Sequence, residues 1–285
     1  MMRSLFSGVA GLKAYQTGMD VIGNNIANVN TYGFKSSRTT YRDVYYQTLS
    51  GSSASNATSS IGGGNPVQIG YGATAATVDV LNTRSGMATT GRPTDCYIDG
   101  EGYFIVKDGS GYLYTRVGSL GFDGDGNLID GNKKIICGSN VVSGALVPLP
   151  NATTGEVTAP AAIKVADYKD YTNITIGSDG KITGEKGGTV TTLGSIALAN
   201  IPNPDALTLQ GGSYLKPVSN TGTSTYYTPG SGATGSLVTS ALESSNVDLA
   251  NEFSQMIITE RGFQANSKII TVSDEMLEDL VNLKR

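Results

Sequence analysis

The chain has 285 residues, and its 24 acidic and 20 basic side chains give a formal net charge of −4, without the basic surplus of a protein that coats nucleic acid. It contains no histidine or tryptophan and only two cysteines, which excludes histidine-based catalysis, most zinc sites and a disulfide-scaffolded domain. Charged residues make up 15% and glycine occupies 38 positions, which favours a secreted or assembled β-rich protein over a cytosolic enzyme.

The first thirty residues have the spacing of a helix. Apolar side chains recur at steps of three and four, with a period of roughly 3.5 residues. They are Leu5, Val9, Leu12, Tyr15, Met19, Ile22, Ile26 and Val29. Interior glycines each cost up to about 1 kcal/mol relative to alanine, so we expect a helix that is marginal alone and that another helix can approach closely. We expect neither a membrane span nor a Sec-type signal here, because no sustained apolar run occurs.

The long middle of the chain changes to alternating apolar and polar positions separated by short turns. Strands are predicted at 96–98, 103–106, 112–115, 135–137, 173–176, 181–183 and 195–198. Asp-Gly pairs such as Asp99-Gly100 and Asp108-Gly109 mark turns. Residues 50–65 and 219–236 are rich in Gly, Ser and Thr, and we expect flexible loops there.

The last forty residues predict a second helix. Ser245 and Asp248 have the spacing of an N-cap and its third-position acid. A strict seven-residue apolar repeat follows at Leu249, Met256, Phe263, Ile270 and Leu277. The companion positions four residues on are Phe253, Glu260, Ser267, Asp274 and Val281. Many of these are polar, whereas a free two-stranded coiled coil needs both rows apolar. The two helices are therefore either ordinary amphipathic helices on a globular core or helices that need further partners.

No catalytic, cofactor-binding or metal site is predicted. Residues 123–127 provide the first three ligand positions of an EF-hand loop, but Leu128 and Lys134 stand where that loop requires Gly and Glu. No phosphate-binding G-x-x-x-x-G-K-[ST] motif occurs. Cys96 and Cys137 lie in apolar strand contexts, so they are either two buried thiols or partners in a disulfide or crosslink.

Motifs along nearly the whole chain resemble those of the bacterial flagellar rod and hook proteins. They are SGVAGL (7–12) and MDVIGNNIANVNTYGFK (19–35), then DGEGYFIV (99–106) and YTRVG (114–118), then LESSNVDL (242–249), RGFQANS (261–267) and NLKR (282–285). Within the family, the opening MMRSLF, the segment 44–51 and the NLKR ending are most similar to hook subunits. The chain departs from many of them in being short, because residues 139–195 leave little room for an outer domain. That length is nearer to the distal rod subunit.

The resemblance implies an α+β fold, mainly β, in which terminal helices pair as a coiled-coil-like inner domain around a discontinuous β domain. Residues 1–35 and 245–285 would form the helical polymerisation domain, and residues 36–244 the β-rich middle domain with a flexible segment at 50–65. The expected subunit-interface residues are Leu5, Val9, Leu12, Met19, Ile22, Ile26, Leu249, Phe253, Met256, Phe263, Ile270 and Leu277. We expect these ends to be disordered in the free monomer and to fold on assembly.

The function implied by the resemblance is mechanical and not enzymatic. Copies of a hook subunit would polymerise helically into a hollow, flexible tube that passes torque from rod to filament. The partners implied are copies of itself, the rod, hook-cap and hook–filament junction proteins and the export apparatus, with no cofactor, nucleic acid or membrane insertion. The location implied is the flagellar hook or basal body outside the cell, reached through the flagellar channel.

Two alternatives to the hook subunit stay open. The first is a distal rod subunit of the flagellar basal body. The second, from a different class, is a secreted β-rich binding protein or a glycan-active enzyme. The lack of histidine and tryptophan disfavours it, because carbohydrate sites usually need a stacking aromatic side chain.

Overall fold

The computed structural model describes residues 2–54, 62–109, 111–142, 145–147, 157, 160–165 and 168–283. Its internal contacts divide the chain into two units. The helical unit contains Met1–Val29, Ser36–Leu81 and Val247–Arg285, and the β unit contains Asn30–Lys35 and Asn82–Asn246. The fold is mainly β with two helices, as predicted. The contacts differ from the predicted division in that residues 36–81 group with the helices and residues 30–35 group with the β unit.

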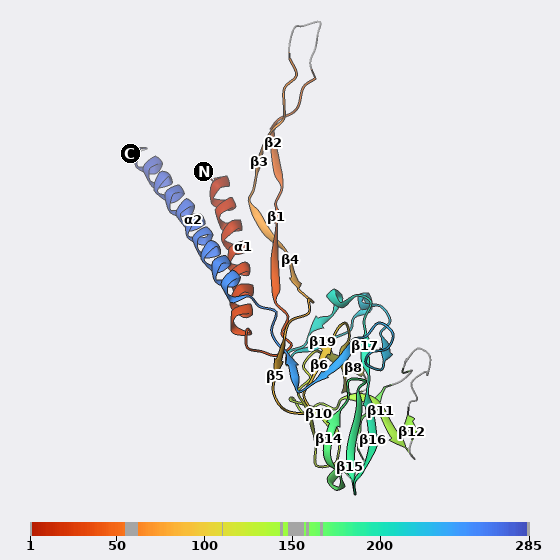
Figure 1. Ribbon diagram of the computed structural model, residues 1–285. Helices are drawn as coiled ribbons and strands as arrows, with labels where there is room; N and C mark the ends of the chain where they lie inside the picture. The colour runs from red at the N-terminus through yellow and green to blue at the C-terminus, as the bar shows by residue number, and fades with distance from the viewer. Residues whose placement is uncertain are drawn as a thin grey trace. The chain divides into compact units, whose positions relative to one another are not determined.

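Two antiparallel helices, α1 (Met2–Ala27) and α2 (Leu249–Asn282), lie side by side in the helical unit (Figure 1). The N-cap of α2 is Asp248, whose carboxylate accepts hydrogen bonds from the backbone N–H groups of Ala250 and Asn251 at 3.0 and 3.4 Å. The expectation that Ser245 would cap this helix is therefore wrong. The helix starts three residues later because Asp248 itself has the extended backbone and the acceptor that a cap requires.

Small residues let the backbones of α1 and α2 approach closely. A Cβ atom on Gly262 would lie 2.7 Å from Cζ of Tyr15, and one on Gly11 would lie 2.9 Å from Nδ2 of Asn266. The facing pairs along the two helices are Ser4–Ser273, Gly8–Ile270, Gly11–Asn266, Tyr15–Gly262, Gly18–Thr259 and Asn25–Glu252. The close approach expected from the glycines is thus present, although the contacts by themselves do not establish a coiled coil.

The second element of the helical unit is a long antiparallel ribbon. Strand β1 (Ser37–Asp43) pairs with β4 (Ala73–Val80), and β2 (Tyr46–Ser50) pairs with β3 (Val67–Gly70). The pairing continues to an isolated bridge between Ser53 and Gly64. The described ends of the segment 50–65, predicted to be a flexible loop, are therefore paired, while residues 55–61 lie outside the described part of the chain.

Two antiparallel six-stranded sheets form most of the β unit. The first has the order β12-β11-β16-β15-β14, with β13 paired to β11; the second has the order β18-β19-β8-β7-β17-β20. The strands of the first sheet are β11 (Cys137–Val142), β12 (Ala145–Val147), β13 (Ala161–Ala162), β14 (Thr172–Ile176), β15 (Lys181–Lys186) and β16 (Thr189–Ile196). Those of the second are β7 (Tyr103–Asp108), β8 (Gly111–Thr115), β17 (Leu198–Asn200), β18 (Thr208–Leu209), β19 (Tyr214–Lys216) and β20 (Thr225–Tyr227).

Shorter elements complete the β unit. Three strand pairs are β5 (Met87–Thr89) with β22 (Ala241–Glu243), β6 (Cys96–Asp99) with β21 (Ser236–Thr239), and β9 (Leu120–Phe122) with β10 (Leu128–Asp130). The 3-10 helices are η2 (Tyr168–Asp170), η3 (Pro204–Ala206) and η4 (Ser219–Thr221). The expectation of a loop throughout 219–236 is wrong, because this segment contains η4 and β20, which pairs with β17. Five of the predicted strands of the middle region are present with shifted ends, at β6, β7, β8, β14 and β15. The strand predicted at 135–137 meets β11 only at Cys137, and the one predicted at 195–198 is divided between β16 and β17.

Strand β7 separates two clusters of the buried core. Its alternating residues Phe104 and Val106 belong to one cluster, and Tyr103 and Ile105 belong to the other, because successive side chains of a strand point to opposite faces. Cys96 lies in the first cluster and Cys137 in the second; both are free and fully buried. The structure thus agrees with the interpretation as two buried thiols and has no disulfide between them.

Candidate functional site

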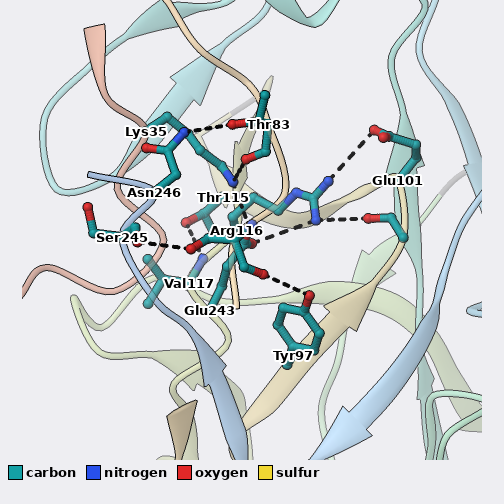
Figure 2. Close-up of polar contacts among 12 residues, drawn as sticks. Lys35, Thr83, Tyr97, Glu101, Thr115, Arg116, Val117, Glu243, Ser245 and Asn246 are labelled. Atoms are coloured by element: carbon teal, nitrogen blue, oxygen red, sulfur yellow. Dashed lines mark hydrogen bonds and ion pairs between the residues drawn. The ribbon is translucent and has the colours of Figure 1, made fainter. Parts of the chain in front are cut away.

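The most heavily charged buried region of the β unit is a network around Glu243, at the end of β22 (Figure 2). Nζ of Lys35 lies 2.6 Å from Oε1 of Glu243, and Nη1 of Arg116 lies 3.7 Å from Oε2. The side chains of Lys35, Glu243 and Arg116 are only 7%, 1% and 4% exposed. Charged side chains are almost never buried to this extent unless they are paired.

Two cations share one fully buried carboxylate in this network. Arg116 also donates to the carbonyl of Gly100 at 3.0 Å, lies 3.8 Å from the carboxylate of the exposed Glu101, and stacks over the ring of Tyr103 at 5.1 Å. Burial lowers the pKa of Lys35, and the adjacent Glu243 opposes that shift. A buried pair of this kind is costly to break, because the remaining charge has no water to solvate it.

Backbone groups from three chain segments bind Glu243 or its partner Lys35. The backbone N–H of Ser85 donates to Oε1 of Glu243 at 3.2 Å, and the backbone N–H of Gly33 donates to the Glu243 carbonyl at 2.8 Å. Lys35 in turn donates to the carbonyl of Thr83 at 2.7 Å. Gly33 has φ +67°, and a Cβ atom there would lie 2.9 Å from Cγ2 of Val117, so the turn requires glycine for both its backbone angle and its space.

The network lies where the chain enters and leaves the β unit. The chain passes between the two units after Val29, Lys35, Leu81 and Asn246. Nδ2 of Asn246 donates to the hydroxyl of Thr83 at 3.0 Å, and the hydroxyl of Ser85 donates to the carbonyl of Ser245 at 2.9 Å. The chain next to three of these crossings is therefore held together inside the β unit, around Lys35, Thr83 and Asn246, which are labelled in Figure 2.

Sequence reasoning missed this network. Lys35 and Glu243 are 208 residues apart, and nothing in their local pattern indicates burial. The available signal was that Lys35, Glu101, Arg116 and Glu243 each lie in a motif that carried the family resemblance. A charged residue inside such a motif was a candidate for a structural ion pair.

The predicted interface residues occupy the half-covered faces of the helices. In α1, Ile22 is buried, whereas Leu5, Val9, Leu12, Met19 and Ile26 are half-buried. In α2, Met256, Ile270 and Leu277 are half-buried, and Leu249, Phe253 and Phe263 are exposed. The row of α2 that faces α1 is polar, lies three residues after the apolar row, and comprises Glu252, Thr259, Asn266 and Ser273.

The helical unit exposes an unusual amount of apolar surface. On α2 the exposed large side chains include Ile257, Ile258, Ile269, Val272, Met276, Leu280 and Val281. On the ribbon they are Tyr41, Tyr45, Tyr46, Leu49, Val67, Ile69 and Val78. Contiguous exposed apolar surface of this kind marks a site of protein association. The described helices contain no stretch long and apolar enough to cross a membrane, and the described residues contain no cluster of His, Cys, Asp and Glu that could hold a metal ion.

Models of three families match successive parts of the chain. Residues 5–35 match the flagella basal body rod protein, residues 97–184 match the D1 domain of flagellar hook protein FlgE/F/G, and residues 238–283 match the C-terminal part of flagellar basal body rod FlgEFG protein. Each matched segment contributes a member of the buried network: Lys35, Arg116 and Glu243 respectively.

The relatives include both rod proteins and hook proteins. The flagellar basal-body rod protein FlgG of Bacillus subtilis is 44% identical over 287 residues, covering all of both chains. The flagellar hook protein FlgE of Borreliella burgdorferi is 27% identical over 443 aligned positions, also covering both chains. The hook protein FlgE of Treponema pallidum is 46% identical over 130 residues, which is 46% of this chain and 28% of that protein.

The helical unit thus combines two helices with a long ribbon, and the β unit is bound by a buried ion network. The full-length identity to FlgG and the three family matches are decisive, and the chain belongs to the flagellar rod and hook protein family. It is therefore a component of the bacterial flagellum.

Proposed function

We propose that the chain is a subunit of the distal rod of the flagellar basal body. The observation that carries this proposal is the 44% identity to a rod protein over the whole of both chains. The alignment with a full-length hook protein instead spans 443 positions, so long stretches of that protein have no counterpart in these 285 residues. The proposal replaces the hook subunit that the sequence motifs favoured.

A helical polymer would account for the exposed apolar surface of the helical unit. A heterologous contact that does not close on itself repeats without limit and generates a tube or filament. The predicted interface residues, such as Phe253 and Phe263 at 50% and 41% exposure, would then be covered by other copies. The β unit would form an outer layer around them, and the assembled rod would transmit torque and leave a channel for exported subunits. The partners proposed are copies of this chain, other rod proteins, the hook and the export apparatus.

A second candidate is the hook subunit. It is supported by the 46% identity to the Treponema pallidum hook protein across nearly half of this chain. The two candidates share the polymer and differ in which structure fails to form without the chain.

Electron cryotomography of cells that lack the gene distinguishes the candidates. The distal rod proposal expects rods that stop short of the cell surface and carry no hook. Complete rods without a hook would overturn it in favour of the hook subunit, and intact flagella would overturn both. Restoration of full rods by the intact gene is the control.

A further inference from the structure

The last strands of the β unit lie in a short segment, residues 235–244, which we call the strap. It contains β21 and β22. Its residues Leu237, Leu242 and Glu243 are only 2%, 4% and 1% exposed. Leu237 belongs to the same core cluster as Cys96. The strap is therefore part of the core of the β unit and not a cover on its surface.

The strap supplies the strand partners of two earlier segments. Strand β21 pairs with β6, strand β22 pairs with β5, and each pair is a two-stranded sheet. The backbone N–H of Leu237 also donates to the carbonyl of Ser178 at 3.0 Å, and that of Ser244 donates to the carbonyl of Gly86 at 2.9 Å. Buried backbone groups that lack partners are unfavourable, so β5 and β6 lose much of the reason to take their native positions when the strap is absent.

The strap also carries the buried carboxylate of the ion network. Lys35 and Arg116 are 2.6 and 3.7 Å from the Glu243 carboxylate, and both cations are buried. Without the strap, the ion pair that remains for them among the described residues is that of Arg116 with the exposed Glu101 at 3.8 Å. Two buried cations that have lost their carboxylate strongly disfavour the closed form.

The strap comes late in the chain. Within the β unit, which begins at Asn30, only Ser245 and Asn246 follow it. The contact between Lys35 and Glu243 spans 208 residues, so it closes a very long loop. Because a chain is made from its N-terminus, nearly all of the β unit is present before the segment that completes its core.

We propose that docking of the strap is the step that closes the β unit, so that the unit stays open in a chain that ends before the strap and closes cooperatively once the strap is present. Folding of the β unit is then conditional on a nearly complete chain. The inference concerns the folding of the single chain and does not depend on which flagellar structure the chain builds.

Hydrogen exchange of the full chain, followed by mass spectrometry, tests the cooperativity. If the strap opens only when the whole unit opens, its backbone amides exchange through the same opening as those of β7. We expect the most protected amides of β7, β21 and β22 to have equal protection within about threefold. Glu243→Gln should speed exchange in all three strands by the same factor, about 100-fold.

Glu101→Gln is the matched control, since it removes the same charge from the exposed member of the network. It should speed exchange by less than about fivefold. Strap amides that exchange at least ten times faster than those of β7, with β7 unchanged in Glu243→Gln, would mean that the strap opens by itself, and would overturn the inference.

Ribosome-bound chains of two lengths test the order of events without any substitution. One chain ends at Thr234 and the other at Asn246, and the same unstructured linker holds each outside the ribosome. The readout is modification of Cys137, which lies on β11, in a different sheet from both strap strands. We expect a thiol reagent to modify Cys137 in the shorter chain and not in the longer one. Protection in both chains would show closure without the strap, and reaction in both would show that the strap does not close the unit; either result overturns the inference.

Discussion

The two units of this chain bury very different kinds of side chain. Among the apolar side chains that are buried in the described part of the chain, Ala14 and Ile22 belong to the helical unit and all the others belong to the β unit. The other buried residues of the helical unit are small or polar, such as Gly8, Gly18 and Thr259. Most of the large exposed apolar side chains show the reverse distribution and lie on the helices and the ribbon.

Because of this difference, we expect the β unit to supply the folding stability of the chain and the helical unit to supply the surface for assembly. The β unit has two apolar core clusters on the two faces of β7 and pairs Lys35 and Arg116 with Glu243 inside the unit, so it has the means to fold by itself. A two-stranded ribbon is marginal in water, and helices owe most of their stability to the packing of an apolar face. Within one chain the helical unit therefore leaves much of its apolar surface uncovered, whereas the β unit buries most of its own.

The largest expected difference in the free energy of unfolding comes from replacing one phenylalanine in each unit. Phe104 is fully buried in the β unit and Phe253 is 50% exposed on α2. Phe104→Ala should lower the free energy of unfolding by about 3–5 kcal/mol, because it removes apolar contacts and leaves a cavity. Phe253→Ala should change it by less than about 0.5 kcal/mol in the free chain. Urea unfolding followed by circular dichroism measures both, and equal effects would remove the distinction between the units.

Stability should be nearly as sensitive to a substitution in the buried ion network. Glu243→Gln leaves Lys35 and Arg116 facing one another without their buried carboxylate, and we expect a loss of about 3 kcal/mol or more from the free energy of unfolding. Glu101→Gln is the control, because Glu101 is 75% exposed, and a weak exposed pair contributes at most about 1 kcal/mol. A loss of similar size in the two variants would show that burial does not decide the role of Glu243.

The reactivity of the two thiols measures whether solvent and reagents reach the core of the β unit. Burial raises the pKa of Cys96 to about 12 and that of Cys137 to about 11, from an ordinary value of 9.0. Between pH 9 and those values the folded state keeps protons that the unfolded state releases, so these groups make stability fall as pH rises. A thiol reagent should modify neither cysteine in the native chain and both in urea. Rapid modification of either native thiol would contradict the closed core.

The smallest effect is expected at the glycines of the helices. A Cβ atom on Gly23 would meet nothing within 4 Å, whereas one on Gly262 would lie 2.7 Å from the Tyr15 ring. Gly23→Ala should stabilise α1 by up to about 1 kcal/mol through helix propensity. Gly262→Ala should not stabilise the protein, because the added methyl group would force the two helices apart or force the Tyr15 ring to move. Thermal melting followed at 222 nm compares them, and equal stabilisation would mean that the close approach of α1 and α2 is not required.

The sequence by itself determined the family, the order of helix, β region and helix, and several strands of the β core. These properties follow from local spacing and from ordered motifs, which a chain carries along its length. Periodicity also placed Met256 and Ile270 on one face of α2.

Only the tertiary structure decided which row of α2 faces α1, because that choice depends on how close Gly11 and Gly18 allow the backbones to come. Only the tertiary structure joined Lys35, Arg116 and Glu243, since contacts across 208 residues leave no local pattern. Local sequence sets backbone preference and amphipathic period, whereas burial of a charge is set by everything that folds around it.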